Sequence, residues 1–215
     1  MSYTLESIRT QVKNRLSDQN FSDAIINQFI NDEEREIFNY FDLPFNRTTI
    51  QHTVNQGENT IALPTGHQKT KGLRIIAPQN DDRDLTQYYL PWGRFKQYFR
   101  QEPDYYSESD LVWWTIYNDN IEFANNSDKT YTLEQDYLIR PTELVEDNDV
   151  PELPEEFQEI LVLGALVRAL EVNDDNDIAQ YQQGKKNLLV QAMLKRLAPQ
   201  QSGKTNILRN SYRGI

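Results

Sequence analysis

Apolar residues recur every three or four positions in two stretches near the N-terminus, which is the spacing of an amphipathic helix. The first stretch covers residues 4–17 and the second covers residues 22–43. Thr4 and Ser22 stand at the start of these stretches, where their side chains are suited to cap a helix. We therefore predict two helices, and we expect the polar run Asn-Asp-Glu-Glu at 31–34 of the second helix to face water.

The pattern changes at Thr48 to short β-rich runs that are separated by turn residues. A first group of runs, over residues 48–77, predicts two or three antiparallel strands. A second group, over residues 111–139, contains the turn at 118–120 and predicts an antiparallel meander. Between the two groups, residues 91–99 place aromatic side chains on one side of a short helix.

Helical spacing returns in the C-terminal part of the chain. Pro151 and Pro154 interrupt an extended approach to a helix over residues 155–171, and Pro154 suits a first helical position. This third helix is apolar around most of its circumference, so we expect it to be central in the core. A polar turn at 173–177 leads into a fourth helix over residues 178–197, and the two helices form a hairpin.

Each helix pair alone leaves an apolar stripe exposed, and the two pairs are the only partners of matching period. We therefore predict an α+β fold in which residues 1–45 and 150–197 form a four-helix bundle. Residues 46–149 form an inserted antiparallel β-rich module, and residues 198–215 form an extended C-terminal docking arm. The predicted core of the bundle consists of Ile26, Ile30, Ile37, Leu163, Leu166, Leu170, Leu189 and Met193.

The predicted arm differs in charge from the rest of the chain. Residues 198–215 contain no acidic residue and carry +3, so the other residues of this −11 chain carry −14. The arm also keeps apolar residues, although it is poorly suited to form a core of its own. Together these features favour docking on an acidic surface. The predicted docking residues are Lys204, Ile207, Leu208, Arg209, Tyr212, Arg213 and Ile215.

Composition excludes several classes of function. The 215 residues include no Cys and only two His, which excludes thiolate and three-His metal sites. A net charge of −11 argues against a broad nucleic-acid-binding face, because such faces bind phosphates through Lys and Arg. No apolar run approaches the roughly 18 to 20 residues of a membrane span, and the start lacks a signal-peptide pattern. We therefore expect neither membrane insertion nor secretion by that route.

The sequence indicates no catalytic residue, metal site or cofactor, and we nominate none. Residues 202–205 look like the end of a phosphate-binding loop, but a helix precedes them where that motif needs a strand. The polar turn at 173–177 lacks the Gly and the bidentate Glu of an EF-hand loop. Two other classes stay open, namely a carboxylate-dependent hydrolase and a carbohydrate-binding module that uses Trp92, Trp113 or Trp114.

Several segments of the chain resemble tailed-phage head-to-tail adaptor proteins. In the N-terminal part they are LSD at 16–18, FSD at 21–23, IND at 30–32 and REI at 35–37. In the C-terminal part, VPELPEEF at 150–157 leads into LVLGALVRAL at 161–170, which looks like the family's entry into its long helix. The order of the strand-rich segments and the approach at 139–141 also fit. The resemblance covers about residues 3–197.

The resemblance implies a structural virion protein without enzymatic activity or cofactor, located in the neck or tail of the phage. It implies a dodecameric homo-oligomeric ring that connects the portal protein to the tail tube or nozzle protein. Assembly would take place in the host cytoplasm, away from any membrane. Genomic DNA would pass through the lumen of the ring without specific binding, since carboxylates repel phosphates. A β-module tail accessory protein is the alternative within the same setting.

Overall fold

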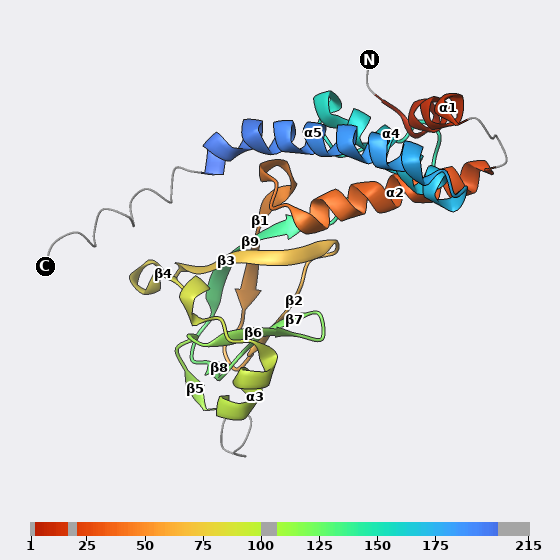
Figure 1. Cartoon of the computed structure of the whole chain (residues 1–215). Coiled ribbons are helices and arrows are strands. Elements are labelled where there is room, and N and C mark those ends of the chain that lie inside the picture. The colour runs from red at the N-terminus through yellow and green to blue at the C-terminus, as the bar shows by residue number, and fades with distance from the viewer. Residues whose placement is uncertain (1–2, 17–20, 100–106, 202–215) are drawn as a thin grey trace, which may run out of the picture. The chain divides into compact units, whose positions relative to one another are not determined.

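The structure is a computed structural model that describes residues 3–16, 21–99 and 107–201 (Figure 1). The chain divides into two compact units, which are described separately below. Arg47–Ile139 forms one of them, called here the β unit, and the described residues on either side of it form the helical unit. Helices and antiparallel sheets together confirm the predicted α+β class.

Four α-helices account for most of the helical unit in the described part of the chain. They are α1 (Leu5–Arg15), α2 (Asp23–Tyr40), α4 (Glu159–Val172) and α5 (Asn176–Gln201), with short 3₁₀ helices η1 (Pro44–Asn46) and η4 (Glu155–Phe157). Thr4 caps α1 with a capping box, in which its side chain accepts from Ser7 N and Ser7 Oγ accepts from Thr4 N. Ser22 caps α2 by accepting from Ile25 N. Both caps agree with the prediction from the sequence.

The third and fourth helices differ from the prediction at their ends. Pro154 precedes the 3₁₀ turn η4, and the α-helix α4 begins only at Glu159. Helix α5 begins at Asn176 and continues to Gln201. Residues 198–201, which we placed in the extended arm, therefore belong to a helix. Residues 185–198 contain no Gly or Pro, so nothing in this stretch opposes the helix by propensity and the helical backbone continues past Leu197.

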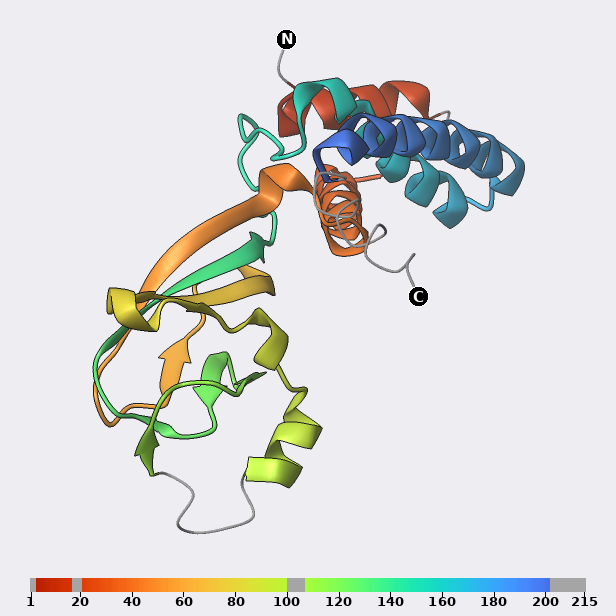
Figure 2. The same ribbon diagram turned by 90° about the vertical axis from the view of Figure 1, so that its left-hand side faces the viewer.

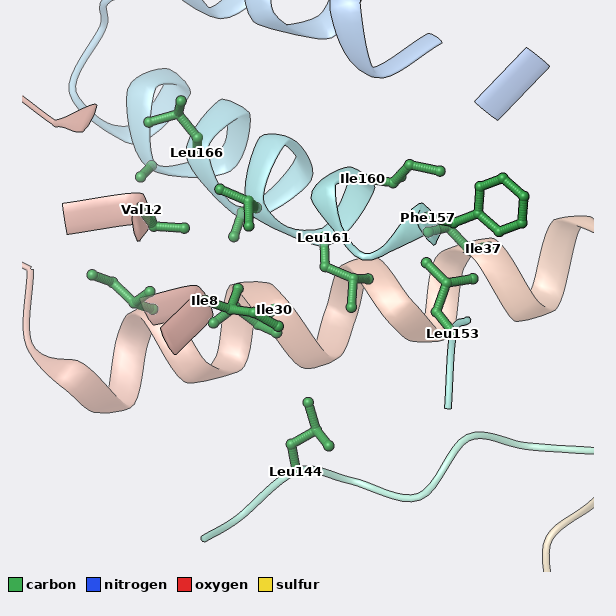
Figure 3. Packing of buried hydrophobic residues seen from close by; sticks show 14 of the residues in the cluster. Ile8, Val12, Ile30, Ile37, Leu144, Leu153, Phe157, Ile160, Leu161 and Leu166 are labelled. Atoms are coloured by element: carbon green, nitrogen blue, oxygen red, sulfur yellow. The ribbon is translucent and has the colours of Figure 1, made fainter. Parts of the chain in front are cut away.

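Helix α4 lies at the centre of the helical unit and contacts α1, α2 and α5. Figure 3 shows its Leu161 and Leu166 side chains beside side chains from α1 and α2, and its Ile160 side chain on the side of Phe157. Within the predicted bundle core, Leu189 is half-buried and packs against the margin of the cluster. The other predicted core residues are all buried, namely Ile26, Ile30, Ile37, Leu163, Leu166, Leu170 and Met193.

The segment 140–149, which we assigned to the β-rich module, belongs to the helical unit. The side chain of Asn31 on α2 bonds both backbone polar groups of Leu144, donating to its oxygen at 2.9 Å and accepting from its nitrogen at 2.8 Å. Leu5 N donates to Asp149 O at 2.9 Å. These backbone partners hold the segment on α1 and α2, which an extended, acidic sequence did not reveal.

The β unit contains a four-stranded sheet in the order β1-β9-β3-β4, a three-stranded sheet β2-β7-β6 and a parallel pair β5-β8. Their bounds are β1 Arg47–Val54, β2 Thr60–Ala62, β3 His67–Ala77, β4 Arg83–Asp84, β5 Glu108–Ser109, β6 Trp114–Tyr117, β7 Asn120–Phe123, β8 Asn126–Ser127 and β9 Tyr131–Ile139. Its other elements are the 3₁₀ helices η2 (Gln79–Asp81) and η3 (Thr86–Tyr88) and the helix α3 (Trp92–Phe99), which covers the predicted short helix. The core between the sheets includes Leu73, Ile75, Phe123 and Tyr131.

The predicted meander is only half correct. Strands β6 and β7 form the expected hairpin, with positive φ at Asn118 and Asp119 in its turn. However, β7 continues the sheet with β2, and β9 lies between β1 and β3 in the other sheet. The register pairs Val54 with Tyr131, so the strands that we divided into two sequence groups share one sheet. Local alternation cannot distinguish these pairings, because it fixes faces and not partners.

Candidate interaction surfaces

The polar run of α2 is mostly buried, contrary to our expectation that residues 31–34 face water. Asn31, Glu33 and Glu34 are all buried, with Glu33 and Glu34 exposed by only 2% and 1%. Asp32 alone of this run is half-buried, and it pairs with Arg35. Charged side chains survive burial when partners compensate their lost hydration, so each buried group needs a partner. These partners lie on α4, on α5 and on the segment before α4.

Glu33 has its partners on the two C-terminal helices. Lys186 of α5 places Nζ 3.0 Å from Glu33 Oε1, and Arg168 of α4 places Nε 3.7 Å from Oε2. Burial raises the pKa of Glu33, and the Lys186 ammonium opposes that rise. Gly164 leaves the space that the Glu33 side chain occupies, since a Cβ there would lie 2.1 Å from Glu33 Cδ. This ion pair couples α2 to α5 across α4.

Glu34 has its partner on the segment before α4. Its Oε1 accepts a hydrogen bond from Leu153 N at 3.2 Å. Burial raises the pKa of Glu34 to about 7, with the backbone hydrogen bonds of Leu153 and Glu152 acting in the opposite direction. Figure 3 shows Leu153 and Leu144 packed beneath the helices that this segment approaches. The buried polar face of α2 therefore holds residues 144–153 in place by hydrogen bonds to Leu144 and Leu153, and we call these residues the clamped segment.

The outer face of α5 carries a row of exposed side chains at alternating spacings of three and four. We call this row the α5 seam. It consists of Ile178, Tyr181, Lys185, Leu188, Ala192 and Lys195, all of which are exposed. Leu188 and Tyr181 are exposed by 67% and 64%. The Lys185 ammonium lies over the Tyr181 ring, 4.4 Å from its centroid. A spacing of three and four residues over this length is the pattern of a helix that packs against another helix.

The sequence contains the signal for this seam, but we predicted no exposed apolar face on this helix. Ile178, Tyr181 and Leu188 have the same spacing as core residues, and periodicity alone does not tell an internal face from one that a partner covers. Helix α5 contacts α4 with a different face, which carries Met193 and the buried Lys186. The seam is the row of α5, containing exposed apolar side chains, that the helical unit leaves uncovered.

A groove of about 450 Å³ lies between α2 and the clamped segment. Gln28, Asp32 and Arg35 line it on the α2 side, and Glu143, Leu144 and Val145 line the other side. The stretch from Glu143 to Asp149 contains four acidic residues and no basic one. Val145 is 67% exposed, and Val150 just after this stretch is also exposed. We call this region, from the groove to Val150, the acidic face.

The β unit exposes a cluster of aromatic side chains around α3 and β6. Trp92 stacks on Tyr117 with ring centroids 3.8 Å apart and 8° between the planes. Trp113 is exposed and contacts Tyr88 edge-on, whereas Trp114 is buried and donates Nε1–H to Leu85 O at 2.7 Å. The two adjacent tryptophans thus differ in exposure, with Trp113 just before the start of β6 and Trp114 in its first position. Trp114 belongs to the core and is not accessible to a sugar.

Within residues 3–16, 21–99 and 107–201, no group of three or more His, Asp or Glu side chains is arranged to hold a metal ion. His52 bonds Gln135 Oε1 at 2.8 Å and His67 bonds Thr70 Oγ1 at 2.9 Å, so each ring is engaged in the sheet. No helix in this same part of the chain is long and apolar enough to cross a membrane. The seven predicted docking residues of the arm, from Lys204 to Ile215, lie outside the described residues.

Comparison with known protein families identifies the family of this chain. The family described as SU10 adaptor protein matches residues 3–210 of the chain. The chain belongs to this adaptor family. The match confirms the resemblance that the helical segments indicated, and it extends beyond Leu197 into the tail. No curated protein matches the chain. An SU10-type adaptor is a structural component of the phage virion, and it joins other head and tail components.

Proposed function

We propose that this adaptor forms a closed ring, dodecameric in the assembled virion, that connects the portal protein to the tail and encloses the path of the genome. The family match over residues 3–210 is the observation that carries this proposal. Two features of the helical unit support it. The α5 seam and the acidic face are separate exposed surfaces of opposite charge, and a ring needs two different surfaces on every subunit.

In the proposed ring the DNA passes through the lumen without specific binding. A net charge of −11 supports this role, because carboxylates near the duplex repel its phosphates and release no counterions. The role is mechanical and electrostatic, so it requires no catalytic residue, metal or cofactor.

We assign the attachment to the portal, or to a neighbouring adaptor, to the tail after Gln201. Its three basic residues match an acidic surface, and its apolar residues supply contacts that salt does not screen. The apolar docking residues are Ile207, Leu208, Tyr212 and Ile215, and the basic ones are Lys204, Arg209 and Arg213. The proposed partner at the opposite end of the ring is a tail tube or nozzle protein.

Native mass spectrometry and electron microscopy of the purified full-length chain, alone and with its portal protein, test the proposal. We expect rings of one stoichiometry whose images show a central channel on the axis of the portal. A chain that stays monomeric in both preparations contradicts the ring.

A further inference from the structure

We propose that neighbouring subunits of the ring contact each other through the α5 seam of one copy and the acidic face of the next. This inference rests on the proposed ring and specifies which surfaces close it. The first step is that the seam requires a partner. Ile178, Tyr181 and Leu188 expose large apolar side chains in a row, and isolated exposed apolar residues do not normally follow a heptad spacing.

The charge of the seam indicates which kind of surface packs against it. Lys185 and Lys195 stand in the seam itself, and α5 has no acidic residue from Ile178 to Gln201. Two seams packed on each other would offer these lysines no carboxylate from residues 178–201, so a symmetric pair of seams is not complementary in charge. The tail after Gln201 is also basic, with no acidic residue, so it does not complement the seam. The occupant must present carboxylates beside apolar side chains.

The acidic face has this composition. Glu143 and Glu146 are exposed there, and Val145 and Val150 expose apolar side chains between and beside them. The other acidic groups of the stretch are already engaged within the subunit. Asp147 pairs with Arg9 at 2.8 Å, and Asp149 accepts from Val145 N at 2.7 Å and from Glu146 N at 2.8 Å. Glu143 and Glu146 are therefore the carboxylates available to a neighbour.

The acidic face is also held firmly enough to act as a docking surface. The Asn31 side chain fixes Leu144, and the Glu34 carboxylate fixes Leu153, so buried bonds anchor the stretch at both ends. In Figure 2 the teal segment before α4 lies on one side of the helical unit, and the turn from α4 into α5 lies on the other. Contact between two different surfaces of the subunit is head-to-tail, and such contacts close into a ring when the rotation from one subunit to the next closes.

Charge exchange between the two surfaces tests the inference. In the full-length chain, Lys185→Glu with Lys195→Glu reverses the seam, and Glu143→Lys with Glu146→Lys reverses the acidic face. We expect each pair alone to raise the concentration at which half the chain is in rings by about tenfold or more, since like charges then face each other. All four substitutions together should restore assembly. Gln180→Glu, on α5 but outside the seam, is the control and should assemble as the parent chain does.

A second variant tests the apolar part of the contact. Leu188→Ser should weaken assembly at all salt concentrations, whereas the charge-reversed pairs should approach the parent chain at high salt. These residues are exposed, so the thermal unfolding of the dissociated subunits should not change.

The outcomes separate this inference from the ring itself. If the parent chain forms no ring, with or without portal, the proposed function fails. If rings form and the reversed and Leu188→Ser variants assemble as the parent does, the ring stands and this contact is wrong. If the seam variants form normal rings that no longer bind portal, the seam serves the portal, which also overturns the contact.

Discussion

The side chain of Glu33 occupies the place where a side chain at position 164 would lie. A Cβ on Gly164 would be 2.1 Å from Glu33 Cδ and 2.4 Å from Oε2, which is far closer than packed atoms approach. The absence of a side chain in the middle of α4 thus lets a carboxylate of α2 reach Lys186 on α5. The relationship explains why a glycine is tolerated inside a helix, where it costs about 0.5–1 kcal/mol relative to alanine.

The substitution Gly164→Ala should therefore destabilise the helical unit. Its methyl group must displace Glu33 from Lys186 or push α2 away from α4, and overpacking of this kind costs about 1–3 kcal/mol. Gly184→Ala on α5 is the matched control, because no atom lies within 4 Å of its Cβ. There we expect a gain of up to about 1 kcal/mol from helix propensity. Urea unfolding followed by far-UV circular dichroism measures the change in unfolding free energy for each variant. Equal effects of the two substitutions would contradict the packing of Glu33.

The buried face of α2 also shows where reading the sequence reaches its limit. The helix itself was predictable, since Ser22 and the spacing of Ile26, Ile30 and Ile37 mark its start and its apolar stripe. The burial of Asn31, Glu33 and Glu34 was not, because a polar run on a helix normally faces solvent. The partners that make burial possible lie more than 100 residues away in the chain, as the bonds to Leu144 and Leu153 show.

The two interaction surfaces could likewise be predicted from the sequence only in part. The acidic character of the stretch from Glu143 to Glu159 was visible in the sequence, but its anchoring on α2 was not. The apolar spacing of α5 was visible, but a single helix does not reveal that one of its faces is left uncovered. The order of the strands was also beyond reach, because β9 pairs with β1, which is 77 or more residues distant at every paired position. Pairing over such distances depends on the whole fold and not on local alternation.

The stability of the helical unit should decrease as the pH rises through the neutral range because of Glu34. Burial raises its pKa from 4.5 to about 7 in the folded protein, so the folded state binds this proton more tightly than the unfolded chain. The resulting stabilisation is complete below about pH 4.5 and is lost as the pH rises through about 7. A shift of this size corresponds to about 3 kcal/mol across this window.

Glu34→Gln should remove this part of the pH dependence, since the amide oxygen still accepts from Leu153 N but no longer titrates. Unfolding free energies of both proteins between pH 4.5 and pH 8 measure the difference. Burial also raises the pKa of Glu33, so a residual decrease with pH is expected in the variant. The backbone bonds that lower the pKa of Asp149 act with the opposite sign and below this window. Parallel curves for the two proteins would contradict the role given to Glu34.

The central position of α4 predicts a large difference between two leucine substitutions on neighbouring helices. Leu166 on α4 is 1% exposed and Leu188 on α5 is 67% exposed. Leu166→Ala should cost about 2–5 kcal/mol, because it removes buried methyl groups and leaves a cavity. Leu188→Ala should change the unfolding free energy of the dissociated subunit by less than about 0.5 kcal/mol. All three tryptophans lie in the β unit, so circular dichroism rather than fluorescence should report these changes. A cost below about 1 kcal/mol at Leu166 would place α4 outside the core.

The final prediction concerns the tail after Gln201, which we propose docks on the portal or on a neighbouring adaptor. Deletion of residues 202–215 leaves α5 complete as the structure describes it, whereas a deletion from Ala198 would remove its last turn. The shortened chain should therefore keep its thermal stability but lose stable attachment to the portal in cosedimentation.

Two further variants separate the contributions of charge and apolar contact in this tail. Fixing each residue on a partner costs about 1–2 kcal/mol of backbone entropy, so three positive charges alone do not hold the segment and apolar side chains must be buried. Replacing Lys204, Arg209 and Arg213 with Ser should weaken attachment mainly at low salt, because ions screen that contribution. Replacing Ile207 and Leu208 with Ser should weaken attachment at every salt concentration. A shortened chain that binds the portal as tightly as the full-length chain would show that the tail has no docking role, and both substituted chains would then bind normally as well.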